Sequence, residues 1–566
     1  MISLKRFMKV GSVIVGLMVS VFTVSSAANP DNLYGRHAEG KNGVVAAANP
    51  EASKIGVEVM KKGGNAVDAA VATAFAISVF EPNASGIGGG GFMLIRMAKT
   101  GKTVVIDYRE KAPAKATPDM FVLDENGKVV NDEITVGGKA SGVPGTVAGL
   151  LTALEKYGTM KRADVMAPAI KHAGEGIIVS KNLEGIIQDN YEKLVKFDAA
   201  SEVYLKDGLP YEAGDRLVNK DLAATLTKIS KEGKKAFYEG EIAKKIADEV
   251  QKQGGLMTVE DLKNYTIEER EPVVGKYRDY TIISCPPASS GGTHIVQLLN
   301  MVENYDLKAM GDNTESWHIW AESMKQAFAD RAEYMGDTAY VKVPLKGLTS
   351  KEYAKEVVKK IDLEKAGKDI KIGDPSKYES GSTTHFSVMD KDGNMVAVTQ
   401  TINYFFGSGV VVPGTGIMMN NEMDDFVPQK NMKNSIEGGK RPLSSMSPTL
   451  VLDPKNRPLM TIGSPGATRI IPAVALTISN VIDHGMTLQE AINAPRIAQF
   501  QSGKLNAEGR MSFESYNKLQ EMGHEINMRG TYDNYFGGVQ GVMMDYDTKT
   551  LQGGADPRRD GQAASF

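Results

Sequence analysis

The sequence predicts a layered α+β fold with antiparallel sheets. Helix-spaced apolar residues dominate residues 146–331, whereas strand-like segments dominate the chain after residue 383. Helices and strands that are segregated in this way pack as separate layers over a hydrophobic core. At 566 residues the chain exceeds the size of one ordinary core, which favours two domains or one large multilayer unit.

The first 28 residues have the composition of a secretory signal. Three basic residues among the first nine precede an apolar run to residue 24, and the small residues 25–28 follow. We expect a signal peptide over residues 1–28, cleaved near Ala27 or Ala28, and therefore an exported protein that is periplasmic or secreted. An uncleaved anchor is the alternative. The apolar run is short for a membrane span, so we expect no stable membrane insertion after signal removal.

Apolar periodicity and chain breakers predict the remaining elements in order. The glycine-rich run 85–91 precedes a strand and lacks a following Gly-Lys-Ser/Thr, so close backbone packing explains it better than a phosphate loop. Residues 364–382 are polar and weakly periodic, which predicts an exposed connection that tolerates cleavage. The expected strands are 44–48, 92–95, 103–108, 383–390, 395–401, 447–452, 459–463 and 540–546, and the expected helices are 51–62, 67–80, 146–157, 221–231, 241–253, 315–331, 467–483 and 487–494.

Charge and cysteine content exclude several classes of function. The net charge is −3, with both signs mixed along the chain and no basic block, so we expect no nucleic-acid partner. Cys285 is the single cysteine, which excludes an intrachain disulfide and a Cys/His metal cluster. We therefore expect neither a metal nor another cofactor.

Residues 383–401 predict a β-hairpin that pairs two threonines. Lys391-Asp392-Gly393 forms a three-residue loop with glycine in the left-handed position, a common hairpin connection. That loop sets Thr383 opposite Thr401. Directly opposed side chains lie about 5 Å apart on one sheet face, so the two hydroxyls can form a hydrogen bond.

Thr383 is the candidate nucleophile, because the common catalytic motifs are missing. The sequence has no Gly-x-Ser-x-Gly elbow, no His-Glu-x-x-His and no P-loop, although its seven histidines leave a Ser-His-Asp triad open. If the chain is cut after Ser382, the freed α-amine of Thr383, whose pKa is about 8 in free peptides, can take the hydroxyl proton. The competing interpretation is a strand that happens to begin with threonines, and we expect His385 to have a structural role in that strand.

Four further segments can complete a site around Thr383. Residues 420–426 concentrate carboxylates and amides that can bind an ammonium group, and residues 441–447 offer adjacent hydroxyls. Residues 463–467 precede a predicted helix, whose first N–H groups can stabilise an oxyanion. Arg109 follows a predicted strand and can hold a carboxylate in a bidentate pair.

The order and amino-acid sequences of these segments resemble those of the γ-glutamyltranspeptidases, a family of the N-terminal-nucleophile hydrolase superfamily. The resemblance implies a four-layer αββα sandwich that cleaves itself before Thr383. The products would be a large subunit (29–382) and a small, catalytic subunit (383–566) that stay together. The resemblance covers about residues 43–560, and its most specific parts are Asp107-Tyr108-Arg109-Glu110, Thr383-Thr384-His385-Phe386-Ser387, Asn420-Asn421-Glu422-Met423-Asp424-Asp425-Phe426, Arg441-Pro442-Leu443-Ser444-Ser445-Met446-Ser447-Pro448 and Gly463-Ser464-Pro465-Gly466.

The resemblance also implies a reaction, that of a γ-glutamyltransferase and glutathione hydrolase. Thr383 would form a γ-glutamyl ester from glutathione or another γ-glutamyl compound, and water or an acceptor amino acid or peptide would take the glutamyl group. The implied catalytic residues are Thr383, Thr401, Gly466 and Ala467, the last two through N–H groups that bind an oxyanion. The implied donor-binding residues are Arg109, Ser444 and Ser445 for the α-carboxylate and Asn403, Glu422 and Asp425 for the α-ammonium.

Three departures from the family pattern bear on function. Ala467 stands where glycine is usual, and its oxyanion role requires ordinary backbone angles. Glu422 stands where glutamine is common, which adds negative charge. Only the 18 residues 426–443 separate Asp425 from Ser444, which resembles members without a lid and favours an open cleft for bulky or polymeric donors. The alternatives are therefore a lidless poly-γ-glutamate or acyl-amide hydrolase of the same fold and, in a different class, a non-catalytic binding protein.

Overall fold

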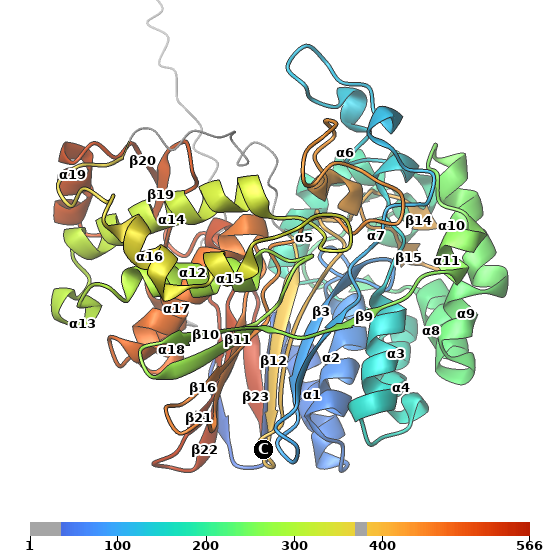
Figure 1. The fold of residues 1–566 in the computed structure, drawn as a ribbon. Helices are drawn as coiled ribbons and strands as arrows, with labels where there is room; N and C mark the ends of the chain where they lie inside the picture. The colour runs from blue at the N-terminus through green and yellow to red at the C-terminus, as the bar shows by residue number, and fades with distance from the viewer. Residues whose placement is uncertain (1–34, 368–381) are drawn as a thin grey trace, which may run out of the picture.

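Two seven-stranded antiparallel sheets stack face to face at the centre of the fold (Figure 1). The computed structural model describes residues 35–367 and 382–566, so the predicted signal peptide and most of the connection 364–382 lie outside the described residues. The first sheet consists, in spatial order, of β1 (Ala38–Gly40), β22 (Thr550–Ala555), β21 (Gln540–Asp545), β17 (Pro458–Gly463), β16 (Thr449–Leu452), β11 (Tyr280–Ser284) and β10 (Val273–Tyr277). The second consists of β23 (Gln562–Ser565), β2 (Gly43–Ala47), β12 (Thr384–Asp390), β13 (Met395–Thr401), β3 (Gly90–Arg96), β4 (Thr103–Asp107) and β9 (Glu268–Arg270).

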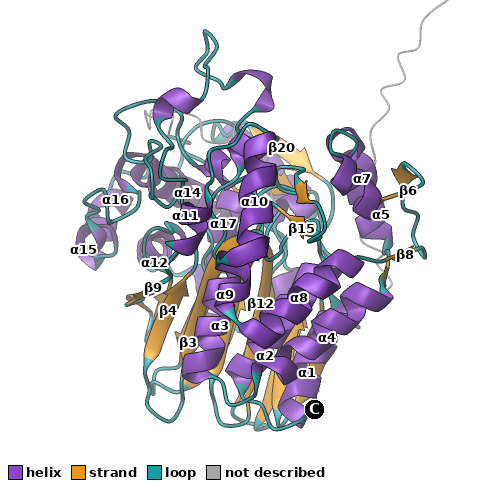
Figure 2. Ribbon diagram, turned by 90° about the vertical axis from the view of Figure 1, so that its right-hand side faces the viewer, coloured by secondary structure: helices purple, strands orange, loops and turns teal. Residues whose placement is uncertain are grey.

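Helices cover the outer face of each sheet, which confirms the four-layer αββα sandwich (Figures 1 and 2). The helices beside the second sheet are α1 (Pro50–Lys61), α2 (Ala66–Phe80), α3 (Thr146–Tyr157), α4 (Arg162–Glu175), α8 (Lys220–Glu232), α9 (Lys234–Tyr238) and α10 (Gly240–Lys252). The helices beside the first sheet are α12 (Gly291–Val302), α14 (Thr314–Tyr334), α16 (Lys351–Val358), α17 (Ile470–Ile482), α18 (Leu488–Asn493) and α19 (Phe513–Glu521).

Shorter elements connect these layers. The helices among them are α5 (Lys181–Asp189), α6 (Tyr191–Leu194), α7 (Asp198–Tyr204), α11 (Val259–Lys263), α13 (Leu307–Met310) and α15 (Leu345–Leu348). The short strands are β5 (Ile177–Ile178) with β8 (Arg216–Leu217), β6 (Leu205–Lys206) with β7 (Leu209–Pro210), β14 (Val411–Val412) with β15 (Ile417–Met418), and β18 (Ile497–Ala498) with β19 (Leu505–Glu508) and β20 (Ile526–Arg529).

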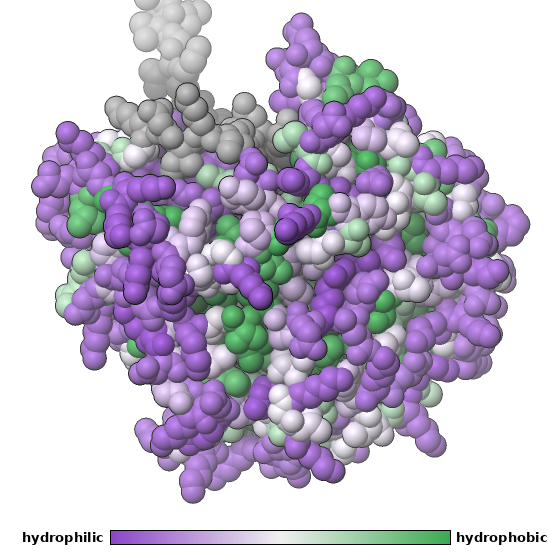
Figure 3. All heavy atoms as spheres, viewed as in Figure 1, coloured by the Kyte–Doolittle hydropathy of each residue, from purple (hydrophilic) through white to green (hydrophobic). Residues whose placement is uncertain are grey.

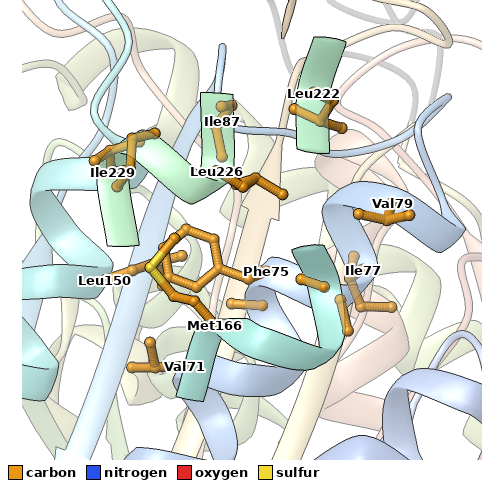
Figure 4. Close-up of a cluster of buried hydrophobic side chains, with 14 of the residues drawn as sticks. Val71, Phe75, Ile77, Val79, Ile87, Leu150, Met166, Leu222, Leu226 and Ile229 are labelled. Atoms are coloured by element: carbon orange, nitrogen blue, oxygen red, sulfur yellow. The ribbon is translucent and has the colours of Figure 1, made fainter. Parts of the chain in front are cut away.

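The helix α2 is apolar on all sides because other elements enclose it. Asn65 accepts hydrogen bonds from the first turn and Asp68 accepts one from the N–H of Asn65, a capping box that starts the helix. Figure 4 shows Phe75 of α2 beside Leu150 of α3 and Met166 of α4. All three side chains are fully buried, and each such burial stabilises the fold by about 1.5–3 kcal/mol.

Most predicted elements lie within a few residues of their expected bounds, but two kinds of difference occur. The predicted helix 467–483 begins only at Ile470, because residues 467–469 form a tighter 3-10 turn. Helix α12 was not predicted, since Gly291 and Gly292 at its start read as turn residues. A Cβ at Gly292 would lie 2.2 Å from the carbonyl oxygen of Cys285, so close packing rather than a turn explains these glycines.

The glycine-rich run 85–91 packs against the backbone, as predicted. A Cβ at Gly88 would lie 2.1 Å from the Met418 carbonyl oxygen, and one at Gly89 would lie 2.0 Å from the Thr401 carbonyl oxygen. Side chains are therefore excluded from these positions. Their absence lets the start of β3 approach the end of β13, where Thr401 lies.

Polar and charged side chains cover most of the surface seen in Figure 3, and the apolar patches on it are small and separate. Within the described ranges, no helix combines the length and the apolar composition that crossing a membrane requires. Cys285 follows β11 directly and is buried as a free thiol.

Candidate active site

The hairpin β12–β13 brings the two predicted threonines together. Its register pairs Thr384 with Gln400, which continues to Thr383 and Thr401 as predicted. The Thr383 hydroxyl donates to Thr401 Oγ1 at 3.1 Å, and the N–H of Asn403 donates to the same oxygen at 2.7 Å. Thr401 Oγ1 thus has its orientation set from the backbone and in turn orients the Thr383 hydroxyl.

The backbone at Thr383 is held in an unusual conformation. Its φ is 142°, a region that β-branched residues rarely adopt. Arg559 Nη1 donates to the Thr383 carbonyl oxygen at 3.0 Å, and the Ser382 hydroxyl donates to the carbonyl of Asn403. The sequence patterns did not identify Arg559, because it reaches Thr383 from the far end of the chain and belongs to no local motif.

Arg109 lies at the centre of a buried cluster of three carboxylates. Its Nη1 is 2.5 Å from Glu422 Oε2 and 3.5 Å from Glu110 Oε2, and its Nη2 donates to Asp425. Tyr265 holds the backbone by donating to the Arg109 carbonyl oxygen at 2.8 Å. The sequence predicted Arg109 for a substrate carboxylate and two of these acids for an ammonium. In the structure the opposite charges pair with each other.

Burial and charge act against each other on the pKa values in this cluster. Burial lowers the pKa of Arg109, but the carboxylates of Glu422, Asp425 and Glu110 outweigh it and raise the pKa overall. Burial raises the pKa of Glu110 to about 8, although Arg109 acts in the other direction. Burial likewise raises the pKa of Glu422 well above its usual value. Arg109 therefore keeps its charge, while Glu110 and Glu422 can hold protons.

Glu422 is the carboxylate that most lacks partners. Among the described residues, neither of its oxygens has a well-directed hydrogen bond, although its side chain is 1% exposed. Asp425 differs, because its side chain is 32% exposed and accepts from Arg109. Arg109 is the charged partner of Glu422, but the carboxylate oxygens still lack well-directed hydrogen bonds, which an ammonium group can donate.

Two asparagines that the sequence placed in the same segment set the geometry of this cluster. Asn420 Oδ1 accepts from the N–H of Glu422 at 3.0 Å, which fixes the start of the turn that carries the acids. Asn421 accepts at its carbonyl oxygen from Asn403 Nδ2 at 3.0 Å. This hydrogen bond uses the Asn403 amide nitrogen and orients the side chain of Asn403.

Ser444 and Ser445 lie opposite the acid cluster, on the loop before β16. Ser444 Oγ accepts from the N–H of Met446 at 3.1 Å, and Ser445 Oγ accepts from Arg331 Nη2 at 3.0 Å. Arg331 is a lining residue that the sequence patterns missed. A basic residue near the end of a helix is ordinary, so nothing in the periodicity of α14 singled it out.

Gly466 and Ala467 begin the 3-10 turn that leads into α17. Their φ values are 127° and 52°, so Ala467 does not have the ordinary backbone angles on which its oxyanion role was conditional. Within the described chain, no hydrogen bond uses the N–H of either residue. Both N–H groups therefore remain as donors, and Ala467 adopts a left-handed conformation that suits glycine.

Replacing Ala467 by glycine will stabilise the protein. Removing the Cβ relieves the cost of the left-handed conformation, and the gain is partly offset by the greater freedom of glycine in the unfolded chain, so we expect about 0.5–1 kcal/mol. Urea unfolding measures this difference. As a matched control, Ala473→Gly inside α17 should destabilise by about 1 kcal/mol, since glycine is unfavourable in a helix. A loss of stability in Ala467→Gly would contradict the strain.

One cavity of about 430 Å³ unites these groups. Nine of the ten predicted site residues line it, and Gly466 adjoins it through Ala467. The apolar residues of its lining include Met335, Phe426, Met432, Leu443 and Ile470. The connection between Asp425 and Ser444 forms part of the lining, through Val427, Pro428, Gln429, Met432, Lys433 and Asn434.

His385 has the structural surroundings that the sequence predicted. Its Nδ1 lies 2.8 Å from Thr399 Oγ1 and its Nε2 lies 3.1 Å from Ser387 Oγ. Both ring nitrogens therefore form hydrogen bonds with hydroxyl groups of the strands β12 and β13. Burial lowers the pKa of His385 to about 3. The cavity is lined by no histidine among the described residues, which removes the support for a Ser-His-Asp triad at this site.

Comparisons with known proteins agree with this geometry. The Gamma-glutamyltranspeptidase family matches residues 52–566. The chain is 43% identical over 560 residues to the glutathione hydrolase proenzyme of Bacillus subtilis (strain 168), covering 95% of this chain and 94% of that one. It is 45% identical over 533 residues to the glutathione hydrolase proenzyme of Escherichia coli (strain K12), covering 92% and 90%. The crystal structure of cephalosporin acylase from Bacillus halodurans has a TM-score of 0.85 at 30% identity, covering 94% of this chain and 97% of that one. The chain therefore belongs to the γ-glutamyltranspeptidase family.

Proposed function

We propose that this protein is a γ-glutamyltransferase and glutathione hydrolase whose nucleophile is Thr383. The observation that carries the proposal is one cavity that holds Thr383 beside Arg109 and two acids, Glu422 and Asp425. A zwitterionic α-amino acid head needs a cation and an anion at a fixed distance from the reacting carbonyl, and this cluster supplies both. Two relatives named glutathione hydrolase proenzyme support the same reaction.

In the proposed first step the precursor cleaves itself before Thr383. The Thr383 hydroxyl attacks the carbonyl carbon of Ser382, the peptide nitrogen leaves as the α-amine of Thr383, and water hydrolyses the resulting ester. The strained φ of Thr383 supports this step, because such strain persists where mechanism uses it. The subunits 29–382 and 383–566 would stay together, since both contribute strands to both sheets.

Each turnover would then use the freed amine as the base. The Thr383 hydroxyl attacks the donor γ-carbonyl and its proton passes to the α-amine, which delivers it to the departing amine of the donor. The N–H groups of Gly466 and Ala467 would bind the oxyanion, because no hydrogen bond within the described chain uses them. The left-handed φ of Ala467 does not meet the condition of ordinary backbone angles, so the role of this residue rests on its unused N–H alone. Water or an acceptor amine then attacks the γ-glutamyl ester, and the Thr383 oxygen regains its proton.

Donor binding requires an exchange of partners at Arg109. The donor α-carboxylate would replace Asp425 on the guanidinium, because the Asp425 side chain is partly exposed and the Glu422 side chain is not. The α-ammonium would then lie between Glu422, the released Asp425 and Asn403 Oδ1. Ser444 and Ser445 would complete the carboxylate site with hydroxyl donors.

A second candidate, an acyl-amide hydrolase, is favoured by the apolar residues that line the cavity. Met335, Phe426 and Leu443 suit a bulky apolar group attached to the scissile amide. The fold similarity to a cephalosporin acylase agrees with such a donor. The two candidates differ in what they require of the acid cluster, because a γ-glutamyl donor carries a zwitterionic head and an acyl amide without an α-ammonium does not.

Amine release from matched donors tests the proposal. We expect kcat/KM for γ-glutamyl-p-nitroanilide to exceed that for glutaryl-p-nitroanilide, which lacks the α-ammonium, by at least about 100-fold, because unpaired buried acids reject the analogue. γ-Linked glutamate oligomers should be cleaved at rates similar to glutathione if the cleft is open. Equal turnover of the first two donors would favour the acylase, and no release from any donor would refute an enzyme.

We also propose export to a periplasm or to the medium. The support is the order of basic, apolar and small residues in the first 28 positions. The large subunit should then begin near residue 28 or 29, and N-terminal sequencing of the purified protein measures this directly. A mature chain that begins at Met1 would contradict export by signal cleavage.

A further inference from the structure

A second cluster of chemically active side chains lies outside the cavity, between α14 and the segment after α19. His318 and Glu322 share one face of α14 at i and i+4, and His524 follows the turn that ends α19. All three are buried, and their ligand atoms lie within 4.8 Å of one another. His318 Nδ1 is 2.8 Å from His524 Nε2, which in turn is 3.9 Å from Glu322 Oε1. Figure 1 shows α14 and α19 on the same side of the fold.

Neighbouring groups determine which nitrogen of His318 can act as a ligand. Its Nε2 lies 2.8 Å from the carbonyl oxygen of Asp362, an acceptor, so Nε2 carries the proton and Nδ1 presents its lone pair. A backbone carbonyl on the far nitrogen is the usual support of a metal-binding imidazole, since it fixes the tautomer and the ring orientation. The proton between the two rings therefore belongs to His524.

A basic side chain lies beside the third member of the cluster. Glu322 accepts from Lys325 Nζ at 2.7 Å, which identifies it as a carboxylate with a cation beside it. Lys325 thus occupies part of the space that a metal ion would use.

We propose that His318, Glu322 and His524 bind one divalent transition metal ion, for which Zn²⁺ is the best match. Two imidazoles and one carboxylate form a common zinc ligand set, and ligands about 2.0–2.1 Å from a tetrahedral ion lie about 3.3 Å from one another. The separations of 2.8 Å between His318 Nδ1 and His524 Nε2 and 3.9 Å between His524 Nε2 and Glu322 Oε1 bracket that value, so each changes by less than about 1 Å. On binding, the proton on His524 Nε2 moves through solvent to Nδ1, and Lys325 moves away from Glu322.

The proposed site joins two parts of the chain that are distant in sequence. The cluster contacts the segment 362–367, whose Asp362 carbonyl oxygen lies beside His318 Nε2. At the other end of this segment, the N–H of Gly367 donates to Glu322 at 3.2 Å, and the Gly367 carbonyl oxygen accepts from Lys325 at 3.0 Å. If Thr383 processing occurs as proposed, His318 and Glu322 belong to the large subunit and His524 to the small one. The metal would then fasten the two subunits, but the site itself does not depend on that cleavage.

Zinc titration of the chelator-treated, dialysed protein tests the site. We expect one equivalent of Zn²⁺ by isothermal titration calorimetry and a higher melting temperature with zinc than without. His524→Gln should weaken binding at least about 10-fold, whereas His37→Gln, which removes an imidazole outside the cluster, should not. Lys325→Met should strengthen binding about 10-fold, because it removes the competing cation from Glu322.

These measurements distinguish the site from surface binding and from a purely structural cluster. Equal zinc binding by wild type, His524→Gln and His37→Gln would overturn the proposal, and so would the absence of binding by wild type. If His524→Gln does not fold, the Lys325→Met result decides alone, since an unchanged zinc affinity in that variant would also overturn it. None of these outcomes depends on amine release, so failure of the metal site and failure of the proposed function remain separate.

Discussion

Replacing Thr383 by alanine will leave the precursor as one chain that releases no amine from γ-glutamyl donors. The hydroxyl is needed twice, for the attack on Ser382 and for the attack on the donor. No histidine of residues 35–367 or 382–566 lines the cavity to activate another nucleophile. Loss of the nucleophile should lower kcat at least about 10⁴-fold. One denaturing gel and one p-nitroanilide assay measure both effects.

Thr383→Ser is the matched variant, because it keeps a hydroxyl and the terminal amine. We expect two fragments, at residues 29–382 and 383–566, and a measurable rate below that of wild type, since serine lacks the branched Cβ that restricts χ1. Two fragments from Thr383→Ala would show that another group cleaves the chain. Full turnover by an uncut Thr383→Ala chain would refute the assignment of the nucleophile.

Replacing Arg109 by glutamine will both destabilise the protein and abolish tight donor binding. Glu110, Glu422 and Asp425 would lose their shared cation in a buried site. Removing one partner of a buried ion pair costs about 3–5 kcal/mol, and because Asp425 is partly exposed and Glu110 and Glu422 can hold protons, we expect the lower end of that range. The donor α-carboxylate would also lose its bidentate partner, so kcat/KM should fall about 100-fold.

Two control variants separate the stability effect from the binding effect. Arg109→Lys keeps the charge and should retain most of the stability, yet it should still raise the KM of the donor because an ammonium group cannot form the paired contacts of a guanidinium. Arg496→Gln removes another buried arginine, 2.7 Å from Asp556, and should lower stability without changing KM. Urea unfolding and donor titrations measure both quantities. An unchanged KM in both Arg109 variants would exclude Arg109 from donor binding.

The hairpin could be predicted from sequence because its contacts are local. The loop Lys391-Asp392-Gly393 sets the register of β12 and β13, and once the register is set the Thr383–Thr401 pair follows from counting residues. Helix α2 was predictable for a similar reason, since an apolar run with a capping box determines its own bounds. The paired threonines are 18 residues apart and the residues of the capping box are three apart, so both features lie within short stretches of the chain.

Contacts between distant segments could not be predicted from sequence in this way. Arg559 reaches the Thr383 carbonyl, and Arg331 reaches Ser445, across separations of 176 and 114 residues. The residues around each partner of such a contact have an ordinary composition, so the sequence does not indicate that the two partners meet. The grouping of His318, Glu322 and His524 is of the same kind, and the sequence, which has one cysteine, suggested no metal cluster at all.

The sequence by itself determined the layered α+β class, the threonine hairpin and, through the resemblance, the family and the candidate residues. Tertiary structure alone decided how those residues meet. It paired Arg109 with Glu422 and Asp425, and it put Ala467 at a φ of 52°, a backbone angle that the sequence left open. The physical reason is that charge pairing and backbone strain depend on which distant segments pack together, and that packing is set by the two stacked sheets rather than by any single stretch of sequence.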